Sequence, residues 1–297
     1  MGGKPRMITV VELAERLQKE ERVLAVSHEA PDGDALGCIS AFLLVCERLG
    51  IPCSAYVPGE SAFPAEYSFL ARLNDVLRGD PPPLEAGTTV YFLDCASSLR
   101  GDSDGFAEKA VRVNIDHHQD NPGFAELNLI DHSAPSSSAI LHEVFRAGEF
   151  AADSEVATAL YVGLVTDTGR FQYSNTTPSA HRLAAELQEE GCDVGSVFRQ
   201  VYESVPLPKL LLVERMLSRL DLRLGGALVV SWLSDDDFSE IGAGEGHAEG
   251  LIDTLRCVEG AQVAVLAREK CCGGQVQTKV SLRSMDGAVD VAELAHE

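Results

Sequence analysis

The sequence is poor in positive charge and has no long hydrophobic run. Its 297 residues contain 24 lysines and arginines against 46 aspartates and glutamates, so the formal net charge is −22. Basic side chains that displace counterions from phosphates supply much of the affinity of proteins for long nucleic acids, so this composition argues against such a partner. No apolar stretch approaches the roughly 18 residues of a membrane-spanning helix, and we expect no membrane association.

Cysteine is sparse and lacks the spacing of a metal or redox site. None of the eight cysteines forms a Cys-Xaa-Xaa-Cys pair, and eight in 297 residues are too few for a disulfide scaffold. We interpret them mainly as buried, reduced thiols. The first residues of the chain also lack the apolar core of a signal peptide. These features predict a cytoplasmic protein.

Strands and helices alternate over the first two thirds of the chain. Three apolar runs are typical of buried strands, namely 22–27, 88–93 and 111–115. Helical patterns occupy the segments 10–20, 34–50, 136–147, 153–166 and 178–190. The alternation predicts an α/β fold, with a mostly parallel sheet flanked by helices.

The pattern changes after Gly191. Two hairpins are predicted, one over 221–232 and one formed by 261–269 with 275–283, and a helix over 247–257 lies between them. This part is expected to be a second, smaller α+β domain, across a cleft from the first. The predicted division is a catalytic domain, a helical connector and a substrate-binding domain, at 1–190, 191–215 and 216–297.

Histidines and aspartates recur where the predicted strands end. The set comprises His28, Asp32 and Asp34 after the first strand, Asp94 after the second, Asp116, His117 and His118 after the third, and Asp167 after a helix. Each residue alone is a common cap, turn or loop residue. Ligands of open α/β sheets bind beyond the carboxyl ends of the strands, so the whole set can converge on one crevice.

Charge counting predicts two metal ions in that crevice. The four aspartates of the set outside the Asp-His-His triplet carry a charge of −4, and together they would raise one another's pKa. Two divalent cations balance this charge, and neutral His28 and His117 complete the ligands. Mixed carboxylate and imidazole ligands suit Mn²⁺ best, with Co²⁺, Fe²⁺, Zn²⁺ and Mg²⁺ as alternatives. Two metals about 3.5–4 Å apart are typical of enzymes that hydrolyse phosphate esters.

These motifs resemble the DHH phosphoesterases. Asp116-His117-His118 is the motif that names the family, and 28–37, Asp94 and Asp167 match its other metal motifs in order. The segment 166–178 is similar to one branch, the bacterial oligoribonucleases, or nano-RNases, that are also 3′-phosphoadenosine 5′-phosphate phosphatases. Two further segments resemble the C-terminal DHH-associated domain of that branch, at 249–253 and 281–284.

The resemblance implies a role for each candidate residue. The first metal would be held by His28, Asp32 and Asp94, and the second by Asp34, Asp94, His117 and Asp167. Asp94 would therefore bridge the two metals. Asp116 would orient His117, and His118 would contact the scissile phosphate.

The predicted strand 275–283 carries a polar face that includes Lys279, Ser281 and Arg283. A solvated edge of a sheet explains this pattern equally well. The resemblance makes Arg283 a phosphate clamp, with Lys279 and Ser281 as further substrate-binding residues. Related C-terminal domains normally end with a Gly-rich stretch closed by His, and here 293–297 stands about where that stretch would begin. We expect a truncated domain or an incomplete clamp.

The expected protein is a metal-dependent phosphoesterase. It would hydrolyse short oligoribonucleotides (nanoRNA) to 5′-mononucleotides, 3′-phosphoadenosine 5′-phosphate to AMP and phosphate, or both. A phosphodiesterase for the linear di-adenylate of cyclic-di-AMP turnover and a non-hydrolytic nucleotide sensor are the alternatives, and a homodimer is left open. The serines at 136–138 lack the partners of a nucleophile and are expected to cap a helix or contact phosphate.

Overall fold

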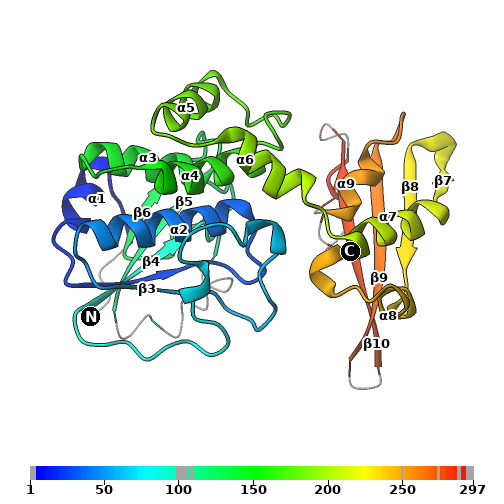
Figure 1. Cartoon of the computed structure of the whole chain (residues 1–297), viewed down its shortest axis with the longest axis horizontal. Helices are drawn as coiled ribbons and strands as arrows, with labels where there is room; N and C mark the ends of the chain where they lie inside the picture. The colour runs from blue at the N-terminus through cyan, green and yellow to red at the C-terminus, as the bar shows by residue number, and fades with distance from the viewer. Residues whose placement is uncertain are drawn as a thin grey trace. The chain divides into compact units, whose positions relative to one another are not determined.

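The computed structural model describes residues 5–97, 106, 110–248, 250–272, 275–285 and 289–291. The chain divides into two compact units, Met1–Glu203 and Ser204–Glu297, which are described separately (Figure 1). A smaller second domain was predicted, and the structure confirms it. The bounds and the roles that the sequence predicts for 1–190, 191–215 and 216–297 stay predictions.

The first unit is built on a six-stranded sheet in which every pair of neighbours is parallel. In spatial order its strands are β1 (Arg6–Met7), β6 (Leu127–Ile130), β5 (Val111–Asp116), β4 (Thr88–Leu93), β2 (Arg22–Val26) and β3 (Cys53–Tyr56). The parallel sheet and the strands β2, β4 and β5 confirm the prediction. Strands β1, β3 and β6 were not predicted, because two to four residues are too few to show a hydrophobic period.

Helices pack against this sheet, mainly through α2 and α3, and α4 packs against α2. The helices of this unit are α1 (Val10–Leu17), α2 (Gly33–Arg48), α3 (Ser137–Ala147), α4 (Ser154–Asp167), α5 (Pro178–Glu189), α6 (Val194–Phe198) and the π-helix η4 (Arg199–Glu203). Alternate residues of β4 enter two cores. Tyr91 packs with the helices, whereas Phe92 packs with Phe106 and Phe124. All six residues of β4 are buried, as expected for a central parallel strand.

The second unit combines a four-stranded mixed sheet with helices. Its strand order is β10 (Gln275–Ser284), β9 (Val263–Cys272), β8 (Leu228–Leu233) and β7 (Asp221–Arg223). The β7–β8 and β9–β10 pairs are antiparallel, as the two predicted hairpins require, and β8 pairs with β9 in parallel. The predicted turn at Gly273–Gly274 lies outside the described residues.

Helices of the second unit enclose a separate small core. They are α7 (Leu207–Ser218), α8 (Asp235–Ile241) and α9 (Leu251–Arg256). Met216 of α7 is fully buried in this core, and its carbonyl accepts a hydrogen bond from the Ser231 hydroxyl at 2.7 Å. Among the described residues there are also short 3₁₀ helices, namely η1 (Ala65–Tyr67), η2 (Leu73–Asp75), η5 (Leu224–Gly226) and η6 (Glu245–Ala248). Within the described part of the chain, no helix is long and apolar enough to cross a membrane.

Candidate metal centre

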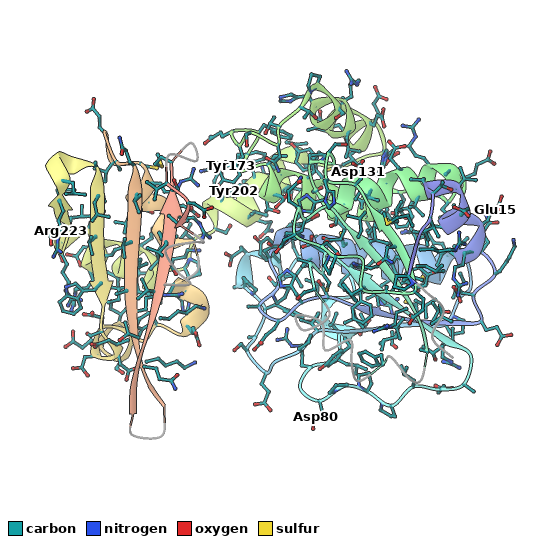
Figure 2. The ribbon with its side chains drawn as sticks, turned by 180° about the vertical axis from the view of Figure 1, so that it is seen from behind. Glu15, Asp80, Asp131, Tyr173, Tyr202 and Arg223 are labelled. Carbon is teal, nitrogen blue, oxygen red and sulfur yellow. The ribbon has the colours of Figure 1, made fainter. Side chains whose placement is uncertain are left out.

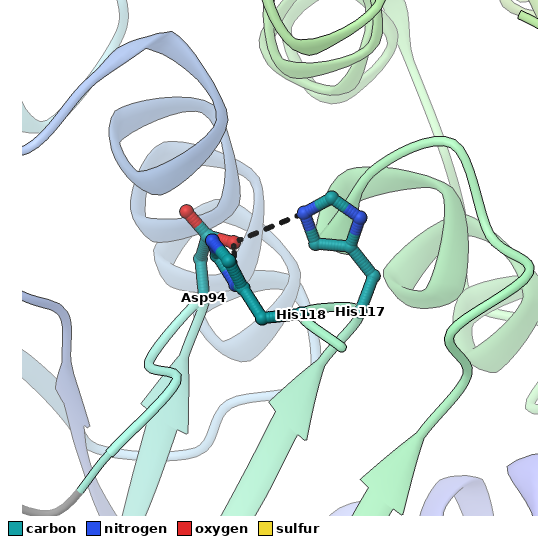
Figure 3. Close-up of side chains that lie close together, drawn as sticks. All are labelled: Asp94, His117 and His118. Carbon is teal, nitrogen blue, oxygen red and sulfur yellow. Dashed lines mark ion pairs between the residues drawn. The ribbon is translucent and has the colours of Figure 1, made fainter. Parts of the chain in front are cut away.

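The carboxyl ends of three neighbouring strands bring the predicted residues together. His28 follows β2, Asp94 follows β4, and His117 and His118 follow β5, as Figure 3 shows for the last three. Their side chains and those of three further aspartates form three groups whose potential ligand atoms lie within 4.8 Å of one another. The groups are His28, Asp32 and Asp94; Asp34, His117 and Asp167; and Asp94, His117 and His118.

Asp94 occupies the centre of this cluster. Its backbone φ of 59° lies in the left-handed region, which an aspartate enters more readily than most residues. Its N–H donates to the Ile115 carbonyl at 3.0 Å, and this contact ties the end of β4 to β5. Burial acts to raise the pKa of Asp94, but hydrogen bonding from His28 and the nearby charge of His118 more than offset it. The net pKa lies below the ordinary aspartate value, which favours the ionised form.

His28 is oriented by its own backbone neighbour. Its Nδ1 donates to the Glu29 carbonyl at 2.8 Å, and its Nε2 lies 3.6 Å from Asp94 Oδ2. This arrangement would make Nε2 the metal-binding nitrogen, because a hydrogen bond at one ring nitrogen fixes the role of the other. Burial acts to lower the pKa of His28, but the contacts with Asp94 and Glu29 raise it above the ordinary value.

Asp32 and Asp34 stand at the start of α2. Oδ1 of Asp32 caps the helix by accepting hydrogen bonds from the N–H groups of Asp34 and Ala35, at 3.0 and 3.1 Å. The capping interpretation is therefore correct for Asp32, and it is compatible with metal binding because Asp32 also belongs to the His28 group. Asp34 is 1 % exposed. Burial, followed by the charges of Asp94 and Asp167, raises the pKa of Asp34 well above its usual range.

Asp167 closes the cluster from the end of α4. Its Oδ2 lies 3.5 Å from His117 Nε2 and accepts a hydrogen bond from Asn175 Nδ2 at 3.3 Å. Burial and the charges of Asp94 and Asp32 raise the pKa of Asp167 to about 7. Carboxylates with raised pKa values at one site indicate mutual repulsion that a bound cation would relieve.

The chain beyond Asp167 is anchored by Tyr202, which lies near Tyr173 (Figure 2). The Tyr202 hydroxyl donates to the Val165 carbonyl at 3.4 Å, and the guanidinium carbon of Arg170 lies 5.1 Å from the centre of its ring. These contacts fasten the segment after α4 to the helix that carries Asp167.

The structure corrects the predicted partner of Asp116. Its Oδ1 contacts His118 Nδ1 at 2.7 Å, and no described contact joins it to His117. Successive residues at the end of a strand point to opposite sides, so Asp116 and His118 share a side that His117 does not. His117 instead directs Nε2 toward Asp94 Oδ1 and Asp167 Oδ2, at 3.8 and 3.5 Å.

Asn121 supports the same pair, and sequence reasoning missed it. Its Nδ2 donates to Asp116 Oδ2 and, at 3.0 Å, to the Cys95 carbonyl. Asp116 is fully buried, and these contacts hold both of its oxygens. Position 121 lies in a loop with no periodic pattern, so only the short distance from the Asp-His-His triplet could have pointed to it.

The predicted substrate-binding residues lie on β10, in the second unit. Lys279 and Arg283 are exposed, and Ser281 is partly buried. They occupy alternate positions, and Lys279 stands opposite Arg268 of β9. Their alternation on one face is as predicted, and their contact with a substrate stays a prediction.

The donor set fits divalent cations. It offers carboxylate oxygens and imidazole nitrogens, and it gathers four aspartates whose charges oppose one another. A parallel α/β sheet with this cluster at the carboxyl ends of its strands defines a metal-dependent hydrolase.

Comparison with known proteins identifies the family. Residues 22–164 match the model of the DHH family, N-terminal domain. The chain is 30% identical over 269 residues to the "Bifunctional oligoribonuclease and PAP phosphatase NrnA" of Thermus thermophilus, and the match covers 90% of this chain and 78% of that protein. The chain belongs to the DHH family, which confirms the resemblance.

Crystal structures agree with the fold. An exopolyphosphatase-related protein from Bacteroides fragilis superposes with a TM-score of 0.81 at 21% identity, over 93% of this chain and 83% of that one. The exonuclease RecJ bound to manganese gives a TM-score of 0.53 at 13% identity, over 98% of this chain and 86% of RecJ. At these identities the likeness concerns the fold alone.

Proposed function

We propose that the protein hydrolyses short oligoribonucleotides to 5′-mononucleotides and 3′-phosphoadenosine 5′-phosphate to AMP and phosphate. The observation that carries this proposal is the convergence of His28, His117 and His118 on Asp94, a carboxylate shared by two of the candidate ligand groups. The relative from Thermus thermophilus, which is named for both activities, supports the choice of substrates.

Two divalent cations, with Mn²⁺ preferred, are part of the proposal. One would be held by His28, Asp32 and Asp94, and the other by Asp34, Asp94, His117 and Asp167. When bound, such a pair supplies an activated water and neutralises charge on the phosphate. The manganese-bound state of RecJ supports the choice of metal.

The side chains of this protein would hold and orient the reacting groups. Asp116 fixes the ring of His118 through Nδ1, so contact with the scissile phosphate would have to be made by Nε2. Because Asn121 and His118 occupy both oxygens of Asp116, the carboxylate cannot turn away. The imidazole is therefore held in place before a substrate arrives, which lowers the cost of reaching the transition state.

Substrates are proposed to be short. The formal charge of −22 repels long phosphate chains, whereas a few phosphates can be held locally by cations and by Arg283, Lys279 and Ser281 of β10. A substrate-binding role for 216–297, a homodimer and a cytoplasmic location belong to the same proposal. The six cysteines whose side chains the structure describes are free thiols, which is compatible with the last of these.

A turnover assay tests the proposal. The full chain with Mn²⁺ is incubated with RNAs of about two to ten nucleotides, with 3′-phosphoadenosine 5′-phosphate, with linear di-adenylate and with pyrophosphate, and products are separated by chromatography. We expect 5′-mononucleotides from the shortest RNAs and AMP from the bisphosphate, and neither with the Asp94→Asn variant. Hydrolysis of pyrophosphate alone, or equal activity of the variant, would contradict the proposal.

A further inference from the structure

Helix α3 begins with three fully buried serines that have different partners. The Ser136 hydroxyl accepts a hydrogen bond from the Ala139 N–H at 3.2 Å and caps the helix, as expected from the sequence. The next two serines instead direct donors at the predicted metal ligands. A cap needs only one of the three hydroxyl groups, so the other two require another explanation.

Asp34 receives most of these donors. The Ser137 N–H donates to its Oδ2 at 2.6 Å, and the Ser138 N–H donates to its Oδ1 at 3.0 Å. The Ser138 hydroxyl also donates to Oδ1. The first N–H groups of a helix have no partner within the helix and carry partial positive charge, so they suit a carboxylate. Both oxygens of Asp34 are thus oriented by α3.

Ser137 also reaches the other ligand group. Its hydroxyl donates to Asp94 Oδ1 at 2.9 Å, while its N–H holds Asp34. Asp34 lies on α2 and Asp94 follows β4, so a single residue of α3 connects carboxylates from two distant segments. Asp94 is shared between ligand groups, whereas Asp34 belongs to one.

The packing around Ser138 leaves its hydroxyl little choice of direction. A Cβ built on Gly163 of α4 would overlap Ser138 Oγ and Asp34 Oδ1. The Cys38 thiol lies 3.3 Å from the same hydroxyl. Glycine at position 163 therefore makes the space in which Ser138 and Asp34 meet.

We infer that Ser137 and Ser138 are positioning residues that set Asp34 and Asp94 in the orientation needed to bind metal ions. The inference rests on the metal dependence in the proposed function and adds residues to that site. It predicts that the two hydroxyl groups affect metal binding to different extents. Loss of the Ser138 hydroxyl disturbs a ligand of one metal, whereas loss of the Ser137 hydroxyl disturbs the shared Asp94 and with it both metals.

Metal binding by the full-length protein, measured without substrate, tests this inference. Wild type and the variants Ser136→Ala, Ser137→Ala and Ser138→Ala are titrated with Mn²⁺ by calorimetry, and the melting temperature of each metal-free protein is recorded. Loss of a partner that orients a metal ligand typically weakens binding by about 10–100-fold. We expect that loss for one Mn²⁺ in Ser138→Ala and for both in Ser137→Ala.

Ser136→Ala is the matched control because it removes a buried hydroxyl from the same turn without touching a ligand. It should lower the melting temperature and leave Mn²⁺ affinity within about threefold of wild type, well short of that loss. Wild-type affinity in both other variants, or an equal loss in the control, would overturn the inference. If Ser138→Ala does not fold, Ser137→Ala decides alone. Failure of wild type to bind Mn²⁺ would instead refute the proposed function.

Discussion

Replacement of Gly163 by alanine should weaken metal binding more than it weakens the fold. Gly163 lies in α4, and an added methyl group would overlap the Ser138 hydroxyl and the Asp34 carboxylate. Both belong to side chains that are fully or almost fully buried, so neither can swing into solvent. The carboxylate has to turn or shift to make room, and its new position no longer matches the other ligands of its group.

Two opposing effects set the change in stability. Alanine is favoured over glycine within a helix by about 1 kcal/mol. Overpacking of a buried site costs about 1–3 kcal/mol. The free energy of unfolding should therefore fall by at most about 2 kcal/mol, which corresponds to about 4–8 °C in melting temperature for a unit of this size. Displacement of Asp34 should lower Mn²⁺ affinity by about 10–100-fold, or about 1.4–2.7 kcal/mol.

Gly148→Ala separates the two effects. A Cβ at Gly148 would overlap the ring of Phe150 at the far end of α3, away from every predicted ligand. We expect this variant to lose stability and keep its Mn²⁺ affinity in a calorimetric titration. If Gly163→Ala binds Mn²⁺ as wild type does, or if both variants lose affinity equally, the proposed crowding of Asp34 is wrong.

Three further predictions concern the site, its substrates and the second unit. Asp94→Ala should reduce bound Mn²⁺ to less than one per chain and remove turnover, whereas Asp34→Ala should remove one metal only; metal analysis after dialysis distinguishes these results from an unchanged content. The hydrolysis rate should fall as RNA grows beyond about five nucleotides, because unpaired phosphates meet an acidic surface, and efficient degradation of long RNA at physiological salt would contradict this. Hydrogen bonding from Arg219 holds the pKa of Asp237 well below its usual range, so the stabilisation that Asp237 provides is present above the unfolded value of about 4 and is lost as pH falls toward the folded value. Asp237→Asn should therefore lower the free energy of unfolding by about 2–4 kcal/mol at pH 7. It should also make urea unfolding, followed through Trp232, the single tryptophan, depend less on acid pH. An unchanged pH profile would show that the pair of Asp237 and Arg219 contributes nothing.

The framework of the first unit could be predicted because its long elements have clear periods. The runs at 22–27, 88–93 and 111–115 are apolar enough to show buried strands, and β2, β4 and β5 lie there. The edge strands β1 and β3 are short, and pairing with neighbours rather than local sequence makes them strands. Tertiary contacts of this kind leave no signal in a local pattern.

The candidate metal ligands could be predicted because histidine and aspartate are residue types that bind metal ions. Histidines and aspartates at strand ends are conspicuous, and the structure does bring His28, Asp94 and Asp167 to one place. The prediction that Asp116 orients His117 was wrong, because the partner of Asp116 depends on which side of the chain His118 faces after the strand ends. Ser137 was recognised only as a capping or phosphate-binding candidate, since its contact with Asp94 joins segments 43 residues apart.

We propose that this cluster binds two divalent cations and uses them to hydrolyse short nucleotides. The most direct measurement is the Mn²⁺ content per chain, followed together with the rate of dinucleotide hydrolysis as Mn²⁺ is added to the chelated protein. We predict that the content reaches two and that hydrolysis appears only as the second ion binds. Full hydrolysis in the presence of chelator, or hydrolysis with no Mn²⁺ bound, would contradict the two-metal proposal.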